Sequence, residues 1–328
     1  MNRLHTIIAL GLAASGAIML AGCGASHAQA SAEEAEETRF IDLTYPIPTF
    51  EPLPGKPTEA DLTKPLGESK PIPSFFPQAV FVPSVNPMDS GHFYRGILRI
   101  AEHHGTHIDA PSHYVNTQAT LEAGAVKPKF QNELTLKDLT GSIVFIDISK
   151  RIQQELDKNG GVPSPDRRRT DFSENSGNNV TVSDIDAVAG QIKNNSWIVV
   201  NSGWGKFFND QNLDTSPFVN GWNFPGVSKA ALDRLIEIEN QNGIRVNGIA
   251  TDNLGIDSGE TERGEGDQWN HSYHSHVRGL QRGWKFVENI ANLDELAAHK
   301  AKKCTLIIGA LPIEGGSGSP SRVMAACN

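Results

Sequence analysis

The sequence predicts a single mixed α/β domain over residues 40–328. This stretch is long enough to bury one large hydrophobic core. Strand-like apolar runs occur at residues 141–148, 197–201 and 244–250. Helix signals fall among these runs without strict alternation, which favours a mixed α/β class over a doubly wound parallel sheet.

Local signals place the other elements in chain order. Residues 46–89 carry many prolines and no clean periodicity, which indicates a long loop with short strands. A variant of the capping box at Ser183 predicts a helix over residues 184–193. Ser228 is the expected N-cap of a second helix over residues 229–240, whose apolar side chains form one stripe.

Two cysteines flank a predicted C-terminal hairpin. Its strands are expected at residues 305–313 and 322–326, joined by a turn rich in Gly and Ser. Cys304 and Cys327 can then face each other across the ladder. Two readings stay open, a disulfide of an exported protein or two unrelated thiols.

Residues 1–22 resemble the signal peptide of a bacterial lipoprotein. Arg3 supplies a positive charge, and residues 6–20 form a mostly apolar segment that is too short for a spanning helix. Leu-Ala-Gly-Cys then ends at Cys23. We therefore expect lipidation at Cys23, a flexible acidic tether over residues 23–39, and the outer membrane as destination. Cleavage after Ala30, which would release a soluble periplasmic protein, is the alternative.

The charge pattern gives no support for nucleic-acid binding. The net charge is −9, and the chain has no basic stripe. Residues 151–180 and 206–223 look like insertions that can reshape a pocket. The run of three arginines at 167–169 is typical of a solvated loop face, with contact to an anionic substrate as the alternative.

Four histidines and one carboxylate lie within residues 103–113, His-His-Gly-Thr-His-Ile-Asp-Ala-Pro-Ser-His. The segment follows a strand-like run at residues 93–100. Gly105 and Pro111 exclude a continuous helix, so we expect a strand end that leads into a loop. Imidazole and carboxylate groups are ligands of zinc, manganese and iron, and this density points to a metal site.

Within this motif, His103, His107 and Asp109 can converge on one ion, and Asp109 can bridge to a second. His104 is the expected bystander, and His113 is free to act as a general acid or base near neutral pH. A second cluster far downstream holds His271, His274 and His276, so seven of the 11 histidines lie in the two clusters. We expect His271 and His274 to be solvated loop residues, with metal contact as the alternative.

The first motif resembles the signature of the cyclase family of metal-dependent hydrolases, which includes bacterial kynurenine formamidases and isatin hydrolases. All fixed positions of His-x-Gly-Thr-His-x-Asp-x-Pro-x-His are present, and Tyr114 stands where Phe is common. Glu288 and Asn289 follow His276 at the spacing seen in the formamidases. Shorter similar segments extend the resemblance over most of residues 40–325.

The resemblance implies a swivelling β/β/α fold and a site for one or two metal ions. The implied ligands are His103, His107 and Asp109 for the first ion, and His276 with the shared carboxylates of Asp109 and Glu288 for the second. His113 would exchange protons with the substrate, and Phe75 and Phe76 are candidates for contacting it. One or two Zn²⁺ ions, or a single Mn²⁺, fit these ligands.

The sequence therefore predicts metal-assisted hydrolysis of a small amide, with an aryl formamide of the kynurenine formamidase type as first substrate. Export argues against assuming that substrate, because tryptophan catabolism is cytosolic. The alternatives are an isatin-like lactam or a lactone, and a non-catalytic metal-binding surface lipoprotein. The expected partners are a small-molecule substrate, a membrane through the lipid alone and, by resemblance, further copies in a homodimer or larger homo-oligomer.

Overall fold

The computed structural model describes residues 38–47, 80–84, 95–114, 125–208, 217–262, 273–299 and 303–328. Residues 37–328 cluster as one compact unit. The predicted lipidation site Cys23, the aromatic pair Phe75 and Phe76, and His271 lie outside the described residues.

Seven strands close into a barrel of mixed direction. Their order is β10-β4-β8-β7-β6-β5-β9, and β9 pairs with β10 to complete the ring. Strands β5 to β8 are mutually parallel, and the other pairs are antiparallel. The barrel strands are β4 (His107–Asp109), β5 (Thr140–Asp147), β6 (Trp197–Asn201), β7 (Gly248–Thr251), β8 (Lys285–Glu288), β9 (Cys304–Ala310) and β10 (Gly318–Cys327).

Three more strands lie outside the ring. β1 (Arg39–Asp42) adds an antiparallel strand to the C-terminal part of β10. β2 (Val80–Ser84) and β3 (Arg95–Arg99) form a separate antiparallel pair. β1 thus begins at Arg39, the last residue of the predicted tether.

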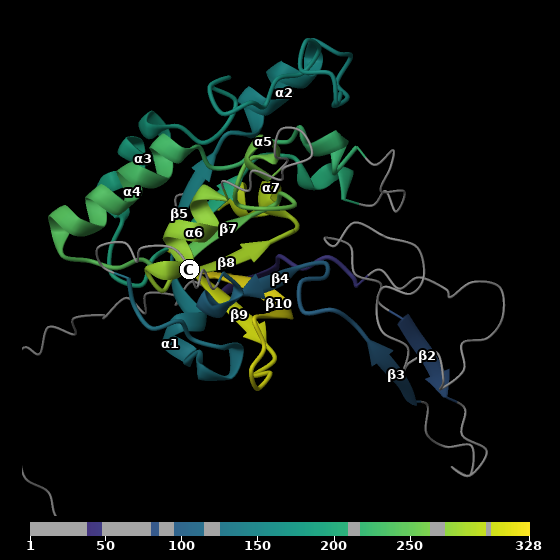
Figure 1. Cartoon of the computed structure of the whole chain (residues 1–328), viewed down its shortest axis with the longest axis vertical. Coiled ribbons are helices and arrows are strands. Elements are labelled where there is room, and N and C mark those ends of the chain that lie inside the picture. The colour runs from purple at the N-terminus through teal and green to yellow at the C-terminus, as the bar shows by residue number, and fades with distance from the viewer. Residues whose placement is uncertain are drawn as a thin grey trace, which may run out of the picture. The chain divides into compact units, whose positions relative to one another are not determined.

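Helices cover the outer face of the barrel. Figure 1 shows α3 (Val182–Val188) and α4 (Lys229–Asn242) side by side, with α6 (His274–Gln281) between α4 and β8. The other α-helices of the described residues are α1 (Leu136–Leu139), α2 (Ser149–Asp157), α5 (Gly259–Glu262) and α7 (Leu293–Ala298), and short 3₁₀ helices lie between the elements. None of the helices in the described part of the chain is long and apolar enough to cross a membrane.

Alternation along the strands creates two cores. On β6, Trp197 and Val199 point into the barrel, where they join Ile108 of β4 and Val287 of β8. Ile198 and Val200 point outward and pack under the helices, together with Phe286. On β4 and β8, therefore, the residues on either side of Ile108 and Val287 face the helix-covered side.

The main elements lie where the sequence predicts them, with shifts at their ends. β6 coincides with residues 197–201, and α4 begins after its N-cap Ser228 and ends at Asn242, before the C-cap Gly243 at φ 62°. The predicted helix at 184–193 starts earlier, at Val182, so the predicted cap Ser183 was wrong. Thr181 caps α3 instead, because its side chain accepts from the backbone N–H of Asp184 while Asp184 accepts from Thr181.

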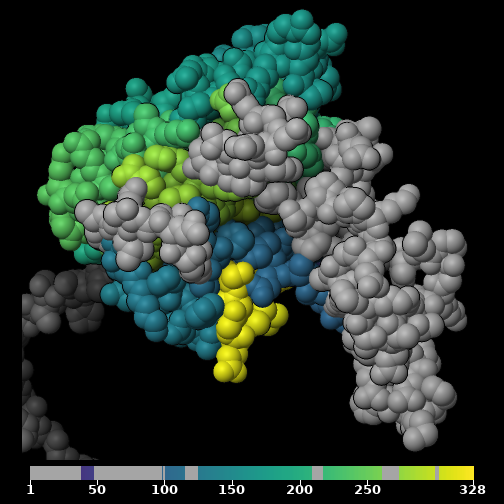
Figure 2. Space-filling view, in the orientation of Figure 1, coloured from purple at the N-terminus to yellow at the C-terminus, as the bar shows by residue number. Residues whose placement is uncertain are grey.

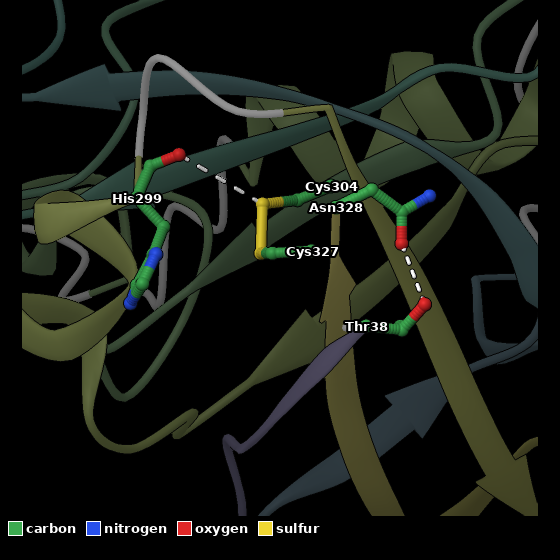
Figure 3. The surroundings of a disulfide bond; sticks show 5 residues. All are labelled: Thr38, His299, Cys304, Cys327 and Asn328. Carbon is green, nitrogen blue, oxygen red and sulfur yellow. Dashed lines mark hydrogen bonds between the residues drawn. A yellow bond between two sulfur atoms is a disulfide. The ribbon is translucent and has the colours of Figure 1, made fainter. Parts of the chain in front are cut away.

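The C-terminal hairpin carries a disulfide. The β9–β10 register places Cys304 opposite Cys327, and the two sulfur atoms are bonded (Figure 3). Beside them, Thr38 Oγ1 donates to Asn328 Oδ1 at 2.7 Å, which ties the first described residue to the last. Of the two readings that the sequence left open, the structure thus contains the disulfide.

Replacing Cys304 and Cys327 together by Ala should lower the free energy of unfolding by about 3 kcal/mol, because the bond closes a loop with a sequence separation of 23. Urea denaturation of the oxidised chain and the double variant measures the difference. A loss below about 0.5 kcal/mol would mean that the pairing of β9 with β10 already closes this loop in the unfolded ensemble.

Lys285, at the start of β8, has a buried amino group. Its ammonium lies 3.4 Å from Asp138 Oδ1 and 3.5 Å from Asn247 Oδ1. Burial disfavours the charged form and outweighs the attraction of Asp138, so the pKa of Lys285 falls to about 8.

The unfolded chain therefore binds more protons than the folded chain between pH 8 and 10.5, and the free energy of unfolding should rise with pH in that window by about 3 kcal/mol from this group. Denaturant melts from pH 7 to 10.5 test this against Lys285→Met, in which this contribution is absent. Parallel pH profiles for the two proteins would contradict the assignment.

Candidate metal centre

The predicted ligands gather on the outer face of β4 and β8, under α6. His107 pairs directly with Glu288 across the antiparallel β4–β8 ladder, and Asp109 lies two residues along the same face. α6 brings in His276, whose ring lies 5.2 Å from Phe286. Gly279 of α6 permits this approach, because an added Cβ would lie 2.7 Å from the Phe286 ring.

Asp109 lies at the centre of the group. Its Oδ1 is 2.6 Å from His103 Nδ1 and 3.3 Å from His107 Nε2, and its Oδ2 is 3.7 Å from His276 Nε2. The carboxyl is 1% exposed, and Oδ2 has no hydrogen-bond partner among the described residues. Burial opposes ionisation, but His113 and His103 outweigh it and hold the pKa of Asp109 well below its usual range.

Glu288 divides its two oxygens between two histidines. Oε2 lies 3.5 Å from His107 Nε2, and Oε1 lies 3.5 Å from His276 Nε2. Asp109 divides its oxygens in the same way. Each of these two imidazoles therefore faces one oxygen from each carboxylate, which is the arrangement of two carboxylates that bridge two cation positions.

Hydrogen bonds on the far side of the rings fix the tautomers of His107 and His276. His107 Nδ1 lies 2.9 Å from the carbonyl oxygen of Gly105, and His276 Nδ1 lies 2.7 Å from Asp257 Oδ2. Both partners only accept, so each Nδ1 carries the proton. In the neutral rings, each Nε2 then presents a lone pair to carboxylate oxygens.

Two acceptors facing each other require a cation between them, either a proton or a metal ion. Burial disfavours a charged ring, but Asp109 and Glu288 outweigh it and raise the pKa of His107 to about 9. The same carboxylates, with Asp257, raise the pKa of His276 well above its usual value against the effect of burial. The site thus holds positive charge strongly.

The spacing fits a metal ion. Two ligands that are each about 2.1 Å from one ion lie about 3.0–3.4 Å apart at octahedral or tetrahedral angles. Of the four distances from the His107 and His276 Nε2 atoms to the two carboxylates, one is 3.3 Å and the other three, at 3.5 to 3.7 Å, exceed that range by up to about 0.3 Å. All four are longer than ordinary hydrogen bonds. Imidazole nitrogens and carboxylate oxygens, with the unpartnered Asp109 Oδ2, suit zinc or manganese.

His113 lies at the exposed side of the same group. Its ring centroid is 3.9 Å from that of His103 and 5.8 Å from that of His276. One of its nitrogens lies within ligand range of His103 and Asp109, so its position alone allows either a ligand or a proton carrier. Desolvation, together with the neighbouring imidazoles, lowers the pKa of His113 against the pull of Asp109.

The other predicted candidates lie elsewhere. His104 of the motif is buried and belongs to neither described ligand group. His274 begins α6 and is 3.0 Å from Asp233 Oδ1. The arginine run carries its own counter-charges, with Arg167 at 2.7 Å from Glu260 and Arg168 at 2.7 Å from Asp166.

Sequence reasoning assigned no role to three residues around the ligands. Asp257 holds His276, and Glu102 and Ser317 contact His103. Glu102 adjoins the motif. The roles of all three depend on contacts over up to 215 positions in sequence, which no local pattern predicts.

A family model described as putative cyclase matches residues 41–258. The chain belongs to this family. His276 and Glu288 lie beyond the matched residues, so their place in the site rests on the structure.

Known relatives point the same way. An isatin hydrolase of Roseibium aggregatum is 26% identical over 282 residues, which cover 83% of this chain and 93% of that protein. A solved isatin hydrolase bound to the product analogue thioisatinate has a TM-score of 0.58 at 23% identity, with 88% of this chain and 92% of that chain covered. Isatin hydrolase A from Ralstonia solanacearum has a TM-score of 0.57 at 21% identity, covering 89% and 92%. The mixed α/β cyclase-like fold is thereby confirmed.

Asp257→Asn should weaken metal binding by roughly 10–100-fold, because the amide cannot accept from Ser275 N–H, His276 N–H and His276 Nδ1 together. Competition titration with a chelator gives the affinity, and the exposed Asp186→Asn serves as matched control. Equal metal affinities in the two variants would show that Asp257 does not support metal binding.

Proposed function

We propose that this protein is a metal-dependent hydrolase that opens a small cyclic amide of the isatin type. The observation that carries the proposal is the pair of buried carboxylates, Asp109 and Glu288, each facing the fixed lone pairs of His107 and His276. A site of this kind binds a divalent cation and serves hydrolysis of carbonyl compounds.

His103, His107 and Asp109 would hold one ion, and His276 would hold a second through the shared carboxylates. A bound divalent cation supplies Lewis-acid activation of water and of the substrate carbonyl. The protein keeps the ligands dry on the inner side, since Asp109, Glu288 and His276 are all buried. The exposed side of His113 leaves access for a substrate.

We assign proton transfer to His113. Its ring stands beside the ligands, and its lowered pKa leaves it neutral near pH 7, as a proton acceptor requires. The ring would take a proton from the attacking water and return it to the leaving amide nitrogen. Hydrolysis of a lactam in this way breaks the ring C–N bond and yields an amine and a carboxylate.

The relatives favour a lactam over an aryl formamide, because those quoted above are isatin hydrolases. The formamidase activity that the sequence suggested first stays a prediction. Both substrates contain a carbonyl carbon bonded to an aryl amide nitrogen, and hydrolysis breaks that C(=O)–N bond, so the same ligands and the same proton carrier can serve either.

The full chain should hold one or two zinc or manganese ions and hydrolyse isatin, and His107→Ala should lose both properties. Metal analysis and absorbance assays on isatin and N-formylkynurenine test this, with Asp186→Asn as control. Metal without hydrolysis of either compound would favour a metal-binding surface protein, and absence of metal after reconstitution would refute the proposal.

His113→Ala should keep the metal and lower kcat by roughly 10²–10⁴-fold. Metal content and steady-state kinetics measured on the same preparation separate the two effects. Loss of metal in this variant would make His113 a ligand, in line with its position beside His103 and Asp109.

We also propose that the enzyme acts outside the cytoplasm as a lipoprotein anchored at Cys23, with a homo-oligomeric state as in the sequence-based expectation. The bond between Cys304 and Cys327 supports an oxidising compartment. Labelling cells with a radioactive fatty acid tests the anchor: Cys23→Ala should abolish incorporation, and an unlabelled wild-type chain would favour the soluble periplasmic alternative.

A further inference from the structure

The β9–β10 turn returns to the metal centre through a carboxylate. Figure 2 shows this turn, in yellow, projecting from the face in view, while its last residues reach back to His103. Glu102 Oε2 accepts from Ser317 N–H at 2.6 Å, from Ser317 Oγ at 2.8 Å and from Gly318 N–H at 2.8 Å. One oxygen thus gathers three donors.

These hydrogen bonds determine whether Ser317 donates to His103 or accepts from it. Ser317 Oγ lies 3.0 Å from His103 Nε2. A hydroxyl has one proton, and the carboxylate of Glu102 only accepts, so that proton points to Glu102. The oxygen then offers a lone pair to His103, and His103 Nε2 must donate.

The opposite side of the His103 ring faces the metal ligands. His103 Nδ1 is 2.6 Å from Asp109 Oδ1. With a proton fixed on Nε2, the 2.6 Å contact of Nδ1 with Asp109 requires a second proton, and a metal ion that replaced this proton would find the Nδ1 lone pair on the inner side. The turn also lies flat against the ring, since a Cβ added to Gly318 would lie 2.4 Å from His103 Cε1.

We propose that Glu102 and Ser317 are positioning residues that hold His103 in the Nε2–H tautomer, so that Nδ1 binds the metal ion. The inference rests on the proposed metal-dependent function. His103 then has the opposite tautomer to His107 and His276, whose protons lie on Nδ1. In all three rings, a hydrogen-bond acceptor on the side away from the site holds the proton, and the nitrogen that faces the site is left to bind the metal ion.

The same atoms also fit a second arrangement, a nucleophilic serine activated by His103 and Asp109. The distances of 3.0 and 2.6 Å match those of a Ser-His-Asp triad. Two observations oppose it. The Ser317 proton is held by Glu102, and the neighbouring N–H groups of Ser317 and Gly318, which a developing oxyanion would need, are bonded to the same carboxylate.

The test uses the full chain loaded with Zn²⁺ and labelled with ¹⁵N-histidine. Long-range ¹H–¹⁵N spectra report which ring nitrogen carries the proton, and chelator competition gives the zinc affinity. Ser317→Ala and Glu102→Gln are compared with the exposed substitutions Ser183→Ala and Glu237→Gln, which make the same chemical changes away from the site. Thermal melting verifies that each variant is folded.

We expect the wild-type His103 ring to carry its proton on Nε2 and the His107 and His276 rings to carry theirs on Nδ1. Ser317→Ala and Glu102→Gln should weaken zinc binding by roughly 10–100-fold, and the controls should not. A wild-type His103 with its proton on Nδ1, or variants with the affinity of the controls, would overturn the positioning role and leave the metal function intact. A wild-type chain that binds no zinc would overturn both.

Discussion

The structure depends on two buried carboxylates that lie on neighbouring strands and contact the same two histidines. Asp109 and Glu288 lie on the outer side of β4 and β8, beneath α6, with exposures of 1% and 6%. Burying one ionised carboxylate without compensation costs several kcal/mol, and burying two side by side costs more. Their surroundings supply the compensation through three imidazoles whose inner nitrogens face oxygens of these two carboxylates.

The hydrogen bonds on the far side of the histidine rings make these residues suitable as metal ligands, because they leave the nitrogens that face the carboxylates without a proton in the neutral rings. If the rings were free to adopt either tautomer, each neutral ring could donate a hydrogen bond from Nε2 to a carboxylate without a metal ion or a second proton. Gly105 and Asp257 remove that freedom for His107 and His276, because they require the proton on the far side. A second proton on the ring or a metal ion must then fill the inner position, and a divalent ion neutralises the two carboxylates with a single particle.

The sequence predicted those parts of the site that are local. Gly105 and Pro111 exclude a helix through residues 103–113, and the short β4 followed by a turn is what the motif forms. The motif does not show that β4 pairs with β8, although this register places His107 opposite Glu288. Resemblance to the cyclase family, and not spacing alone, brought His276 and Glu288 into the predicted ligand set.

What the sequence could not provide depends on competition between neighbours or on distant contacts. Both Thr181 and Ser183 are suitable caps for α3, and the choice falls on Thr181 because Asp184 bonds back to it while Asp186 is paired with Arg234. Cys304 and Cys327 were equally compatible with free thiols until the β9–β10 register placed them opposite each other. The supporting residues Asp257 and Ser317 have no motif of their own, because their roles exist only after the barrel closes.

Anomalous X-ray diffraction from crystals grown with Mn²⁺ or Zn²⁺ tests the central claim most directly. The account predicts an anomalous peak about 2.0–2.2 Å from His107 Nε2 and from oxygens of Asp109 and Glu288, with any second peak on the His276 side of the same carboxylates. Carboxylates bonded only to protonated histidines and water, with no anomalous peak at saturating metal, would contradict it.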